Sequence, residues 1–171
     1  MMGNQATITT TLGGAILLLV TISSKPTALL VWNASGSVPI GLYGVRPTDH
    51  LAVPDLVVAL PPDPLAGFLA ERGYLPRGVP LIKRVVALSG QTICRKHLAI
   101  TVDGIDLGTA RERDHRGRHL PVWAGCRVIE DGEVFLMNWD EPASLDGRYF
   151  GPMPRSAIVG RAHPVWTFEQ E

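Results

Sequence analysis

Two residues of this chain, Ser37 and Lys83, have side chains that together could carry out nucleophilic attack on a carbonyl. Ser37 stands between Gly36 and the pair Val38-Pro39. Glycine adopts positive φ at little steric cost, while proline fixes its own φ and drives the preceding residue towards an extended conformation. The Ser37 hydroxyl is therefore expected on a bent loop, and loops carry many catalytic groups. Because Ser-Gly-Ser also describes an ordinary turn, this serine needs a base from elsewhere in the chain.

Lys83 is the candidate base. It lies in the apolar segment 81–88. On a strand, its side chain would share one face with Leu81, Val85 and Ala87. Burial disfavours the charged form of a lysine and lowers its pKa, and a neutral lysine can accept a proton from a hydroxyl. The alternative is that the ammonium group reaches solvent from a strand end, as most lysines do.

A third polar segment comes late in the chain, where Ser144, Asp146 and Arg148 occupy alternate residues. Side chains alternate faces along an extended backbone, so all three would point the same way if this loop is extended. The pattern alone assigns no role to any of the three.

The composition limits the class of protein that these residues could serve. The chain has 171 residues, enough for one domain with a sizeable core and a small subdomain. Basic and acidic residues number 16 each, so no overall charge favours nucleic acid as a partner. The counts of glycine (18) and proline (14), together with short runs of valine, isoleucine and leucine, predict a mainly β domain.

The expected strands follow the short apolar runs. They cover residues 28–32, 55–60, 81–88, 158–162 and 164–166. A short helix is expected from Asp63, the N-cap, to Gly73, with Pro64 at the first helical position. Two Asp-Gly pairs predict β-hairpins, one over residues 98–107 and one over residues 127–138.

The amino terminus differs from the rest of the chain. Residues 6–22 hold no charged side chain and contain the apolar run 12–20. A membrane-spanning helix needs about 20 apolar residues, so this segment is of marginal length for one. We expect an uncleaved anchor over residues 1–27, with the domain 28–171 on the far side of the membrane. A signal peptide is the alternative, although no basic region precedes the apolar run.

Two cysteines, Cys94 and Cys126, bracket a segment of different composition, which we expect to form an inserted subdomain over residues 94–126. If the domain lies outside the cytoplasm, a disulfide between them is natural and would close this insert at its base. The chain-entropy treatment assigns a loop of this length about 3–4 kcal/mol. The charged run 111–119 is most simply a solvated loop. Interleaved acidic residues weaken the alternative that it grips a polyanion or a partner.

The insert also offers candidate zinc ligands. These are Cys94, His97, His115, His119 and Cys126. His115 and His119 are four residues apart, but their arginine- and glycine-rich surroundings predict no helix that would align them. A disulfide would consume both thiolates, so no metal is expected.

Taken together, the polar segments resemble those of the type I signal peptidase family, which uses a serine–lysine pair. The resemblance runs from about residue 33 to residue 166, and the insert matches least. The branch that it resembles most is that of the conjugative-transfer peptidase TraF. The matching segments are SGSVPIGLY (35–43), RGYLP (72–76), PLIKRVVALSG (80–90) and SLDGRYFG (144–151). The resemblance implies a signal-peptidase-like antiparallel β-sheet domain with an inserted β-hairpin subdomain and one N-terminal apolar anchor helix.

The resemblance also implies a role for each site residue. Ser37 would be the nucleophile and Lys83 its general base. The Ser35 hydroxyl and the Ser37 backbone N–H would meet the oxyanion. Ser144 would orient the lysine, and Asp146 would help to position the site.

Two arginines, Arg84 and Arg148, could pair with Asp146, and the sequence does not choose between them. The chain also departs from general signal peptidases at three places. Those enzymes have one more residue between the nucleophile and its proline, a difference that favours the TraF branch. Residues 89–91 read Ser-Gly-Gln where those enzymes have Pro-Gly-Asp, and Gly147 stands where they have a serine. The last two departures concern the surroundings of the lysine and leave the nucleophile, the base and Asp146 in place.

The implied activity is that of a membrane-associated serine endopeptidase, without a cofactor, that matures a conjugative pilin precursor for plasmid transfer by cleavage, with or without cyclisation. The resemblance also allows another membrane-inserted pre-protein as the substrate in place of the pilin. The enzyme would sit in the lipid of the bacterial inner membrane with its catalytic domain in the periplasm. Two alternatives stay open: a general signal peptidase for exported proteins, and a membrane-anchored assembly factor without catalysis.

Overall fold

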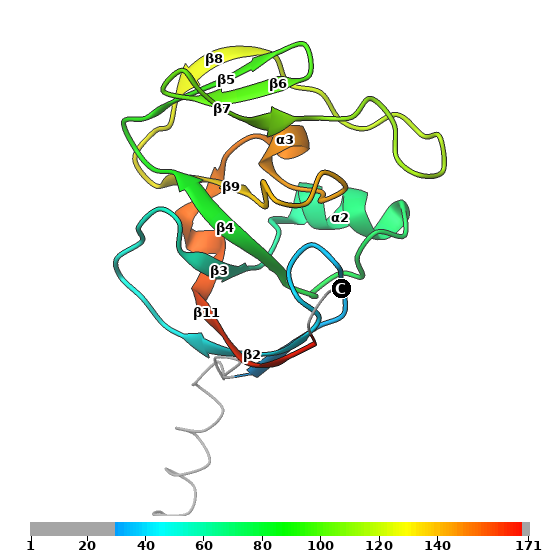
Figure 1. The fold of residues 1–171 in the computed structure, drawn as a ribbon, viewed down its shortest axis with the longest axis vertical. Helices are drawn as coiled ribbons and strands as arrows, with labels where there is room; N and C mark the ends of the chain where they lie inside the picture. The colour runs from blue at the N-terminus through cyan, green and yellow to red at the C-terminus, as the bar shows by residue number, and fades with distance from the viewer. Residues whose placement is uncertain (1–29, 169–171) are drawn as a thin grey trace, which may run out of the picture.

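The computed structural model describes residues 30–168, which form two antiparallel β-sheets with a nine-residue helix beside them (Figure 1). The predicted mainly β fold is confirmed. The anchor expected over residues 1–27 lies outside the described residues. Between residues 30 and 168, no helix is both long enough and apolar enough to cross a membrane.

The larger sheet has seven strands in the order β1-β2-β11-β3-β4-β9-β10, and the smaller has the order β7-β6-β5-β8. The strands of the larger sheet are β1 (Leu30–Asn33), β2 (Gly41–Arg46), β3 (Leu56–Ala59), β4 (Leu81–Ala87), β9 (Glu133–Met137), β10 (Met153–Pro154) and β11 (Ile158–Thr167). Those of the smaller sheet are β5 (Thr92–Lys96), β6 (Ala99–Val102), β7 (Ile105–Thr109) and β8 (Gly125–Val128). The helices are α2 (Asp63–Glu71), α3 (Gly147–Phe150) and a 3₁₀ turn at Arg155–Ala157.

Helix α2 begins one residue earlier than predicted. Its N-cap is Pro62, whose ψ of 156° is extended, so Asp63 and Pro64 both lie in the first turn. Asp63 is therefore not the cap, and its carboxylate favours the helix through the helix dipole instead. The predicted end is confirmed, because Gly73 adopts a φ of 67° just beyond the helix.

Strand β2 is missing from the predicted strands because it contains Gly41 and Gly44, which weaken strands in general. Here the close approach of β11 requires them. A Cβ atom on Gly41 would stand 2.2 Å from the carbonyl oxygen of Trp166, and one on Gly44 would stand 2.3 Å from the His163 ring. Both glycines therefore permit the pairing of β2 with β11.

One of the two predicted hairpins is confirmed. Strands β6 and β7 pair across Asp103 and Gly104, whose φ angles of 49° and 81° suit a type I′ turn. The hairpin predicted over residues 127–138 is wrong, because β8 pairs with β5 while β9 pairs with β4 and β10. The reason is burial: β9 is almost wholly buried and lies between two strands, whereas the exposed β8 takes the edge of the smaller sheet.

The two sheets share a hydrophobic core. Its buried members come from both sheets and are Val86, Ala87, Ile93, Ile100, Val102, Ile129, Phe135 and Met137. Arg95 of β5 is also buried, and its Nη1 donates a 2.6 Å hydrogen bond to the carbonyl of Arg148 in α3. The smaller sheet is therefore attached to the segment after β9 both by packing and by a buried hydrogen bond.

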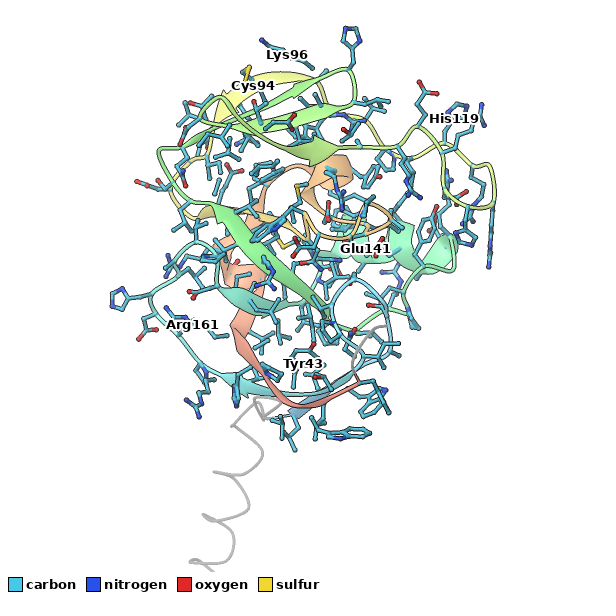
Figure 2. The ribbon with its side chains drawn as sticks, in the orientation of Figure 1. Tyr43, Cys94, Lys96, His119, Glu141 and Arg161 are labelled. Carbon is cyan, nitrogen blue, oxygen red and sulfur yellow. A yellow bond between two sulfur atoms is a disulfide. The ribbon has the colours of Figure 1, made fainter. Side chains whose placement is uncertain are left out.

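A disulfide joins Cys94 of β5 to Cys126 of β8, and the two residues are register partners (Figure 2). The insert expected over residues 94–126 lies within the smaller sheet, which runs from Thr92 to Val128. Both sulfur atoms are used in this bond, so neither is a thiolate for zinc. Over the described residues, no group of three or more His, Cys, Asp or Glu side chains is arranged to hold a metal ion.

The charged run 111–119 is more ordered than the solvated loop we expected. Asp114 accepts a hydrogen bond from the Tyr74 hydroxyl at 2.5 Å and another from Arg118 Nε at 2.7 Å. Arg118 also donates through Nη1 to the carbonyl of Arg72, at 2.9 Å. The run is therefore docked against the residues that follow α2, while most of its other side chains are exposed.

Candidate active site

Residues 34–40 join β1 to β2 and carry Ser37, the candidate nucleophile, so we call them the nucleophile loop. Ser37 is half-buried and Ser35 is exposed, so a substrate can reach both hydroxyls. Asn33 is buried and holds the loop from within. Its Nδ2 donates to three loop carbonyls at 2.7, 3.0 and 3.1 Å, while its Oδ1 accepts from the Ser35 N–H and hydroxyl. The loop is thus an ordered turn rather than a flexible one.

Tyr43 supports the far end of the same loop. It lies in β2, is buried, and its hydroxyl donates a 2.7 Å hydrogen bond to the carbonyl of Pro39 (Figure 2). Burial raises the pKa of Tyr43, and the charge of Arg84 opposes that rise. The hydroxyl therefore stays protonated at neutral pH, as a hydrogen-bond donor must.

Lys83 lies in β4 and is only 3% exposed, so the alternative that its ammonium group reaches solvent is wrong. Burial lowers the pKa of Lys83 from 10.5 to about 8. The charge of Asp146 acts against this fall, and the charge of Arg148 adds to it. Half of the molecules then carry a neutral lysine near pH 8, which is the state that a general base requires.

Two serine hydroxyls lie within hydrogen-bond distance of the Lys83 amine. Nζ is 3.3 Å from Ser37 Oγ and 2.7 Å from Ser144 Oγ. The Ser37 and Ser35 hydroxyl oxygens are 3.2 Å apart. Four of the residues singled out in the sequence are therefore brought together, from three segments of the chain. A neutral amine at this distance from Ser37 can accept its proton.

The segment that holds Asp146 is not extended, so the condition under which Ser144, Asp146 and Arg148 would point the same way is not met. Asp146 is instead the N-cap of α3, and its Oδ1 accepts from the backbone N–H of Arg148. Aspartate is a favoured N-cap residue, and Gly147 permits the tight turn, because a Cβ atom there would stand 2.5 Å from the Phe135 ring. Ser144 therefore reaches Lys83, while Arg148 folds back onto Asp146.

Arg148 is the partner of Asp146. Its Nη2 and Nε lie 2.8 Å and 2.9 Å from the carboxylate oxygens, and both side chains are almost completely buried. Arg84 points elsewhere: its guanidinium stacks 5.2 Å from the Trp139 ring centre and lies 3.9 Å from the Asp140 carboxylate. Of the two arginines proposed for this pair, the structure therefore uses Arg148 and leaves the Arg84 side chain outside the site.

Asn138 is a site residue that sequence reasoning missed. It is buried and follows the last residue of β9. Its Nδ2 donates to the carbonyl of Ser37 at 2.9 Å, and its backbone N–H donates to the Asp146 carboxylate at 3.1 Å. Asparagine is common in turns, so the only available signal was its place between an apolar strand and a polar segment. Asn33 was missed for the same reason.

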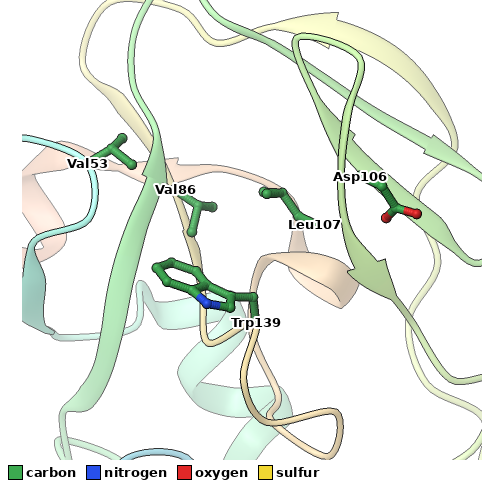
Figure 3. A pocket seen from close by; sticks show the side chains of 5 residues that line it. All are labelled: Val53, Val86, Asp106, Leu107 and Trp139. Carbon is green, nitrogen blue, oxygen red and sulfur yellow. The ribbon is translucent and has the colours of Figure 1, made fainter.

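An apolar pocket lies between β4 and β7, apart from these groups (Figure 3). Its lining residues are Val53, Val86, Asp106, Leu107 and Trp139. None of them is among the polar residues that surround Ser37 and Lys83. The reactive groups therefore lie on the nucleophile loop and the adjoining strand, and not in this pocket.

Comparisons with known proteins identify the family to which the chain is similar. Residues 2–167 match the family described as signal peptidase, peptidase S26. The conjugal transfer protein TraF of Agrobacterium fabrum is 38% identical over 154 residues, a match that covers 80% of this chain and 82% of that one. A plasmid transfer protein TraF of Escherichia coli is 32% identical over 170 residues, covering 91% and 92%.

A solved structure, the signal peptidase I of Enterococcus faecalis, is 16% identical to this chain. The superposition covers 66% of this chain and 97% of that one, with a TM-score of 0.40. That similarity is too low to bear on the site, whose description rests on this chain's own geometry.

Proposed function

This chain belongs to the signal peptidase family, peptidase S26, close to its TraF members, and we propose that it is an endopeptidase with Ser37 as nucleophile and Lys83 as general base. The observation that carries the proposal is the 3.3 Å approach of Ser37 Oγ to a buried amine whose pKa lies near 8. Serine–lysine pairs are a recognised variant of the hydrolase triad.

In the first half-reaction, Ser37 Oγ bonds to the scissile carbonyl carbon while its proton passes to Lys83 Nζ. The lysine gives that proton to the leaving amine as the carbon–nitrogen bond breaks, which leaves an ester on Ser37. In the second half-reaction, water or an amine attacks the ester, Lys83 takes the proton of the attacking group, and Ser37 receives it on release. Both half-reactions use the same proton path between two side chains.

The oxyanion would be met by the Ser37 N–H and by the Ser35 hydroxyl. A hydroxyl has one proton to donate, and Ser35 Oγ lies 2.9 Å from its present acceptor, Asn33 Oδ1. Ser35 would therefore rotate from Asn33 towards the substrate as the negative charge develops. Each such donor is typically worth about 10²–10³-fold in rate.

Ser144 and Asp146 would support the base in different ways. Ser144 accepts the 2.7 Å hydrogen bond from Nζ and so holds the amine beside Ser37. Asp146 acts on the lysine through its charge, which opposes the loss of the proton, while the Arg148 charge favours it. Because the two charges of the buried pair act in opposite directions, burial remains the main cause of the lowered pKa of Lys83.

As substrate we propose a pilin precursor, or another membrane-inserted pre-protein, acted on during plasmid transfer. The support is that the relatives are named conjugal and plasmid transfer proteins. Water and the pilin's own amino terminus would compete for the ester on Ser37. Mass spectrometry of the product separates these outcomes, because a cyclic product is lighter than the cleaved one by one water.

A second candidate function is that of a general signal peptidase. The observation that favours it is a match to a probable signal peptidase I-1 of Synechocystis, 32% identical over 110 residues. That match covers 64% of this chain and 52% of the relative, less than the TraF matches cover. Incubation with a panel of exported pre-proteins beside the pilin precursor would distinguish the two functions.

Replacing Ser37 with alanine tests the proposal. Ser37→Ala is expected to lower precursor cleavage by at least about 10³-fold, as the loss of a catalytic serine does in other hydrolases. Ser89→Ala is the matched control, because that exposed serine bonds only to Asp131 on a distant turn. Normal processing by Ser37→Ala would reject the peptidase and leave the non-catalytic assembly factor.

The proposed place is the bacterial inner membrane, with the domain in the periplasm, and an exposed aromatic patch supports contact with lipid. Its members are each about half exposed and are Leu30, Trp32, Val165, Trp166 and Phe168. The ring centres of Trp166 and Phe168 are 4.5 Å apart, and those of Trp32 and Trp166 are 6.0 Å apart. The strands that carry the patch, β1 and the end of β11, lie together at the lower end of the domain (Figure 1). Such aromatic side chains concentrate at membrane–water interfaces.

Fluorescence quenching by brominated lipids tests this placement in vesicles that contain the full chain. We expect quenching that falls by more than half in the double variant Trp32→Phe, Trp166→Phe, because these two rings would contact lipid. Trp123→Phe is the matched control, since that indole bonds to the Gly147 carbonyl beside α3. Equal quenching in the double variant and the parent would reject the patch as a lipid contact.

A further inference from the structure

Asn138 uses its side-chain amide to extend the pairing between β9 and β4. The last residue of β9, Met137, is register partner to Arg84, and the strand ends there. The Asn138 amide then continues the pattern: Oδ1 accepts from the N–H of Arg84 at 3.1 Å, and Nδ2 donates to the carbonyl of Ile82 at 3.2 Å. One side chain thereby holds the backbone on both sides of Lys83.

The same amide also reaches the nucleophile. Nδ2 donates its second hydrogen to the Ser37 carbonyl, at 2.9 Å. Ser37 and Lys83 are 46 residues apart in sequence, yet one amide nitrogen donates to the nucleophile loop and to β4. The position of Ser37 relative to Lys83 is therefore set by a single planar group that contacts the backbone of each.

The backbone of Asn138 is in turn fixed by the buried ion pair. Its N–H donates to Asp146 Oδ2 at 3.1 Å, and its carbonyl accepts from Arg148 Nη2 at 3.2 Å. Over residues 30–168, the bonds to the Asp146 carboxylate come from Arg148 and Asn138, and none comes from Ser37 or Lys83. Asn138 therefore provides a continuous hydrogen-bonded route from the ion pair to the nucleophile.

We propose that Asn138 is a positioning residue that holds Ser37 at reacting distance from Lys83 and transmits the placement of the Asp146–Arg148 pair to the nucleophile. The inference rests on the proposed function, because it assigns a part in the reaction of Ser37 and Lys83. Asn138 touches neither reacting atom and carries no charge. Asn138 therefore affects the geometry of the site. The protonation of Lys83 depends instead on burial and on the charged groups nearby.

This assignment makes a distinct kinetic prediction for Asn138→Ala. A displacement of about 1 Å between reacting groups can cost about 10²-fold in rate, so we expect kcat to fall about 10- to 100-fold. KM should change less than about threefold, since Asn138 is buried away from a bound peptide. The midpoint of the pH–rate profile should stay where it is in the parent enzyme, because no charge has been added or removed.

The experiment measures kcat, KM and the pH–rate profile of the full chain in detergent or vesicles, with a precursor peptide as substrate. The unfolding midpoint of each variant shows that it is folded under assay conditions. Gln91→Ala is the matched control, because it also removes a side-chain amide with two hydrogen bonds, one accepted from the Leu88 N–H and one donated to Asp103, and neither bond involves Ser37, Lys83 or Asp146. The control should lose some stability and keep its kcat.

Asn138→Leu serves where Asn138→Ala does not fold. It keeps most of the side-chain volume, but it removes both the oxygen that accepts from Arg84 and the nitrogen that donates to the carbonyls of Ser37 and Ile82. Because the donor is lost and no charge is added, kcat measured on the high-pH plateau, where the lysine is neutral, should still fall at least about tenfold.

The outcomes separate this inference from the proposed function. If parent activity does not depend on Ser37, the proposed function fails. If it does depend on Ser37 but folded Asn138 variants keep the parent kcat, the positioning role is wrong. A kcat that recovers fully at high pH in Asn138→Ala would also overturn it, since Asn138 would then act on the lysine pKa. A fall at every pH with an unmoved midpoint supports it.

Discussion

The nucleophile loop and the segment from Asn138 to Arg148 meet at the same site but are held in opposite ways. The loop is exposed or half-buried around Ser35 and Ser37, and the neutral amides of Asn33 and Asn138 hold it. In the later segment Asn138, Ser144, Asp146 and Arg148 are buried, and a charged pair holds them. A reactive hydroxyl must remain accessible to the substrate, whereas the residues that hold it in position can be buried. Stability should therefore depend mainly on the buried segment, and reactivity on the loop.

The largest stability effect is expected from breaking the buried pair with Asp146→Asn. Arg148 would remain buried without its counter-charge, and such losses typically cost about 3–5 kcal/mol. Asp140→Asn is the matched control, because its contact with Arg84 is long, at 3.9 Å, and mostly exposed, so its loss should cost less than about 1 kcal/mol. Urea unfolding measures both. Equal midpoints for the two variants would show that the buried segment is not the main source of stability.

The next effect concerns the lysine that lies between the two regions. The folded protein lowers the pKa of Lys83 from 10.5 to about 8, so between these values the unfolded chain binds more protons. Stability should therefore rise with pH through this window, by about 3 kcal/mol at 1.36 kcal/mol for each pKa unit. Comparing the parent with Lys83→Met from pH 7 to pH 10.5 isolates this contribution. A constant difference between the two proteins would contradict the lowered pKa.

The same titration should appear in the reaction rate. Below pH 8, kcat/KM should fall about tenfold for each pH unit, because the neutral lysine becomes scarce. Above pH 8 the rate should reach a plateau. The reactivity of Ser37 on the loop would then depend on pH through Lys83, whereas the ion pair of the buried segment would not.

The smallest stability effect is expected from the loop itself. Asn33→Ala removes the bonds to the loop carbonyls; water can replace the part-buried bonds to Ser35 and Pro39, while the Val38 carbonyl is buried, so we expect a loss of about 1–2 kcal/mol. Activity should fall more than stability, at least about tenfold in kcat, because Ser37 would lose its fixed position. Unfolding and kinetics on the same samples make the test. A large loss of stability with an unchanged kcat would show that the loop contributes to stability rather than to reactivity.

The sequence allowed the proposed nucleophile and base to be predicted, but not the residues that hold them. Ser37 and Lys83 could be proposed because three segments of the chain, taken together, resemble those of a serine–lysine peptidase family, although each segment alone is ordinary. Asn33 and Asn138 could not, because the value of an amide at a strand end depends on which strands become neighbours. The pairing of β9 with β4 was itself mispredicted, so the role of Asn138 in that pairing was out of reach.

Glycine and aspartate caused the other differences. Strand β2 was not predicted because it contains Gly41 and Gly44. Glycine is required at these two positions only because β11 packs closely against them. Helix α3, which Asp146 caps, was not predicted because a helix of four residues leaves no periodic pattern. The conformation at each of these residues is determined by tertiary contacts, which cannot be predicted from local sequence propensity.

The bond from Arg95 to the Arg148 carbonyl has a consequence for heat inactivation. The smaller sheet shares a core with β4 and β9, and this bond fastens it to α3 beside the buried pair. Melting of the smaller sheet alone would expose that core and remove a donor from α3. Loss of activity on heating should therefore coincide with a single cooperative transition of the whole domain. Reducing the Cys94–Cys126 disulfide should lower the temperature of that one transition rather than create a second.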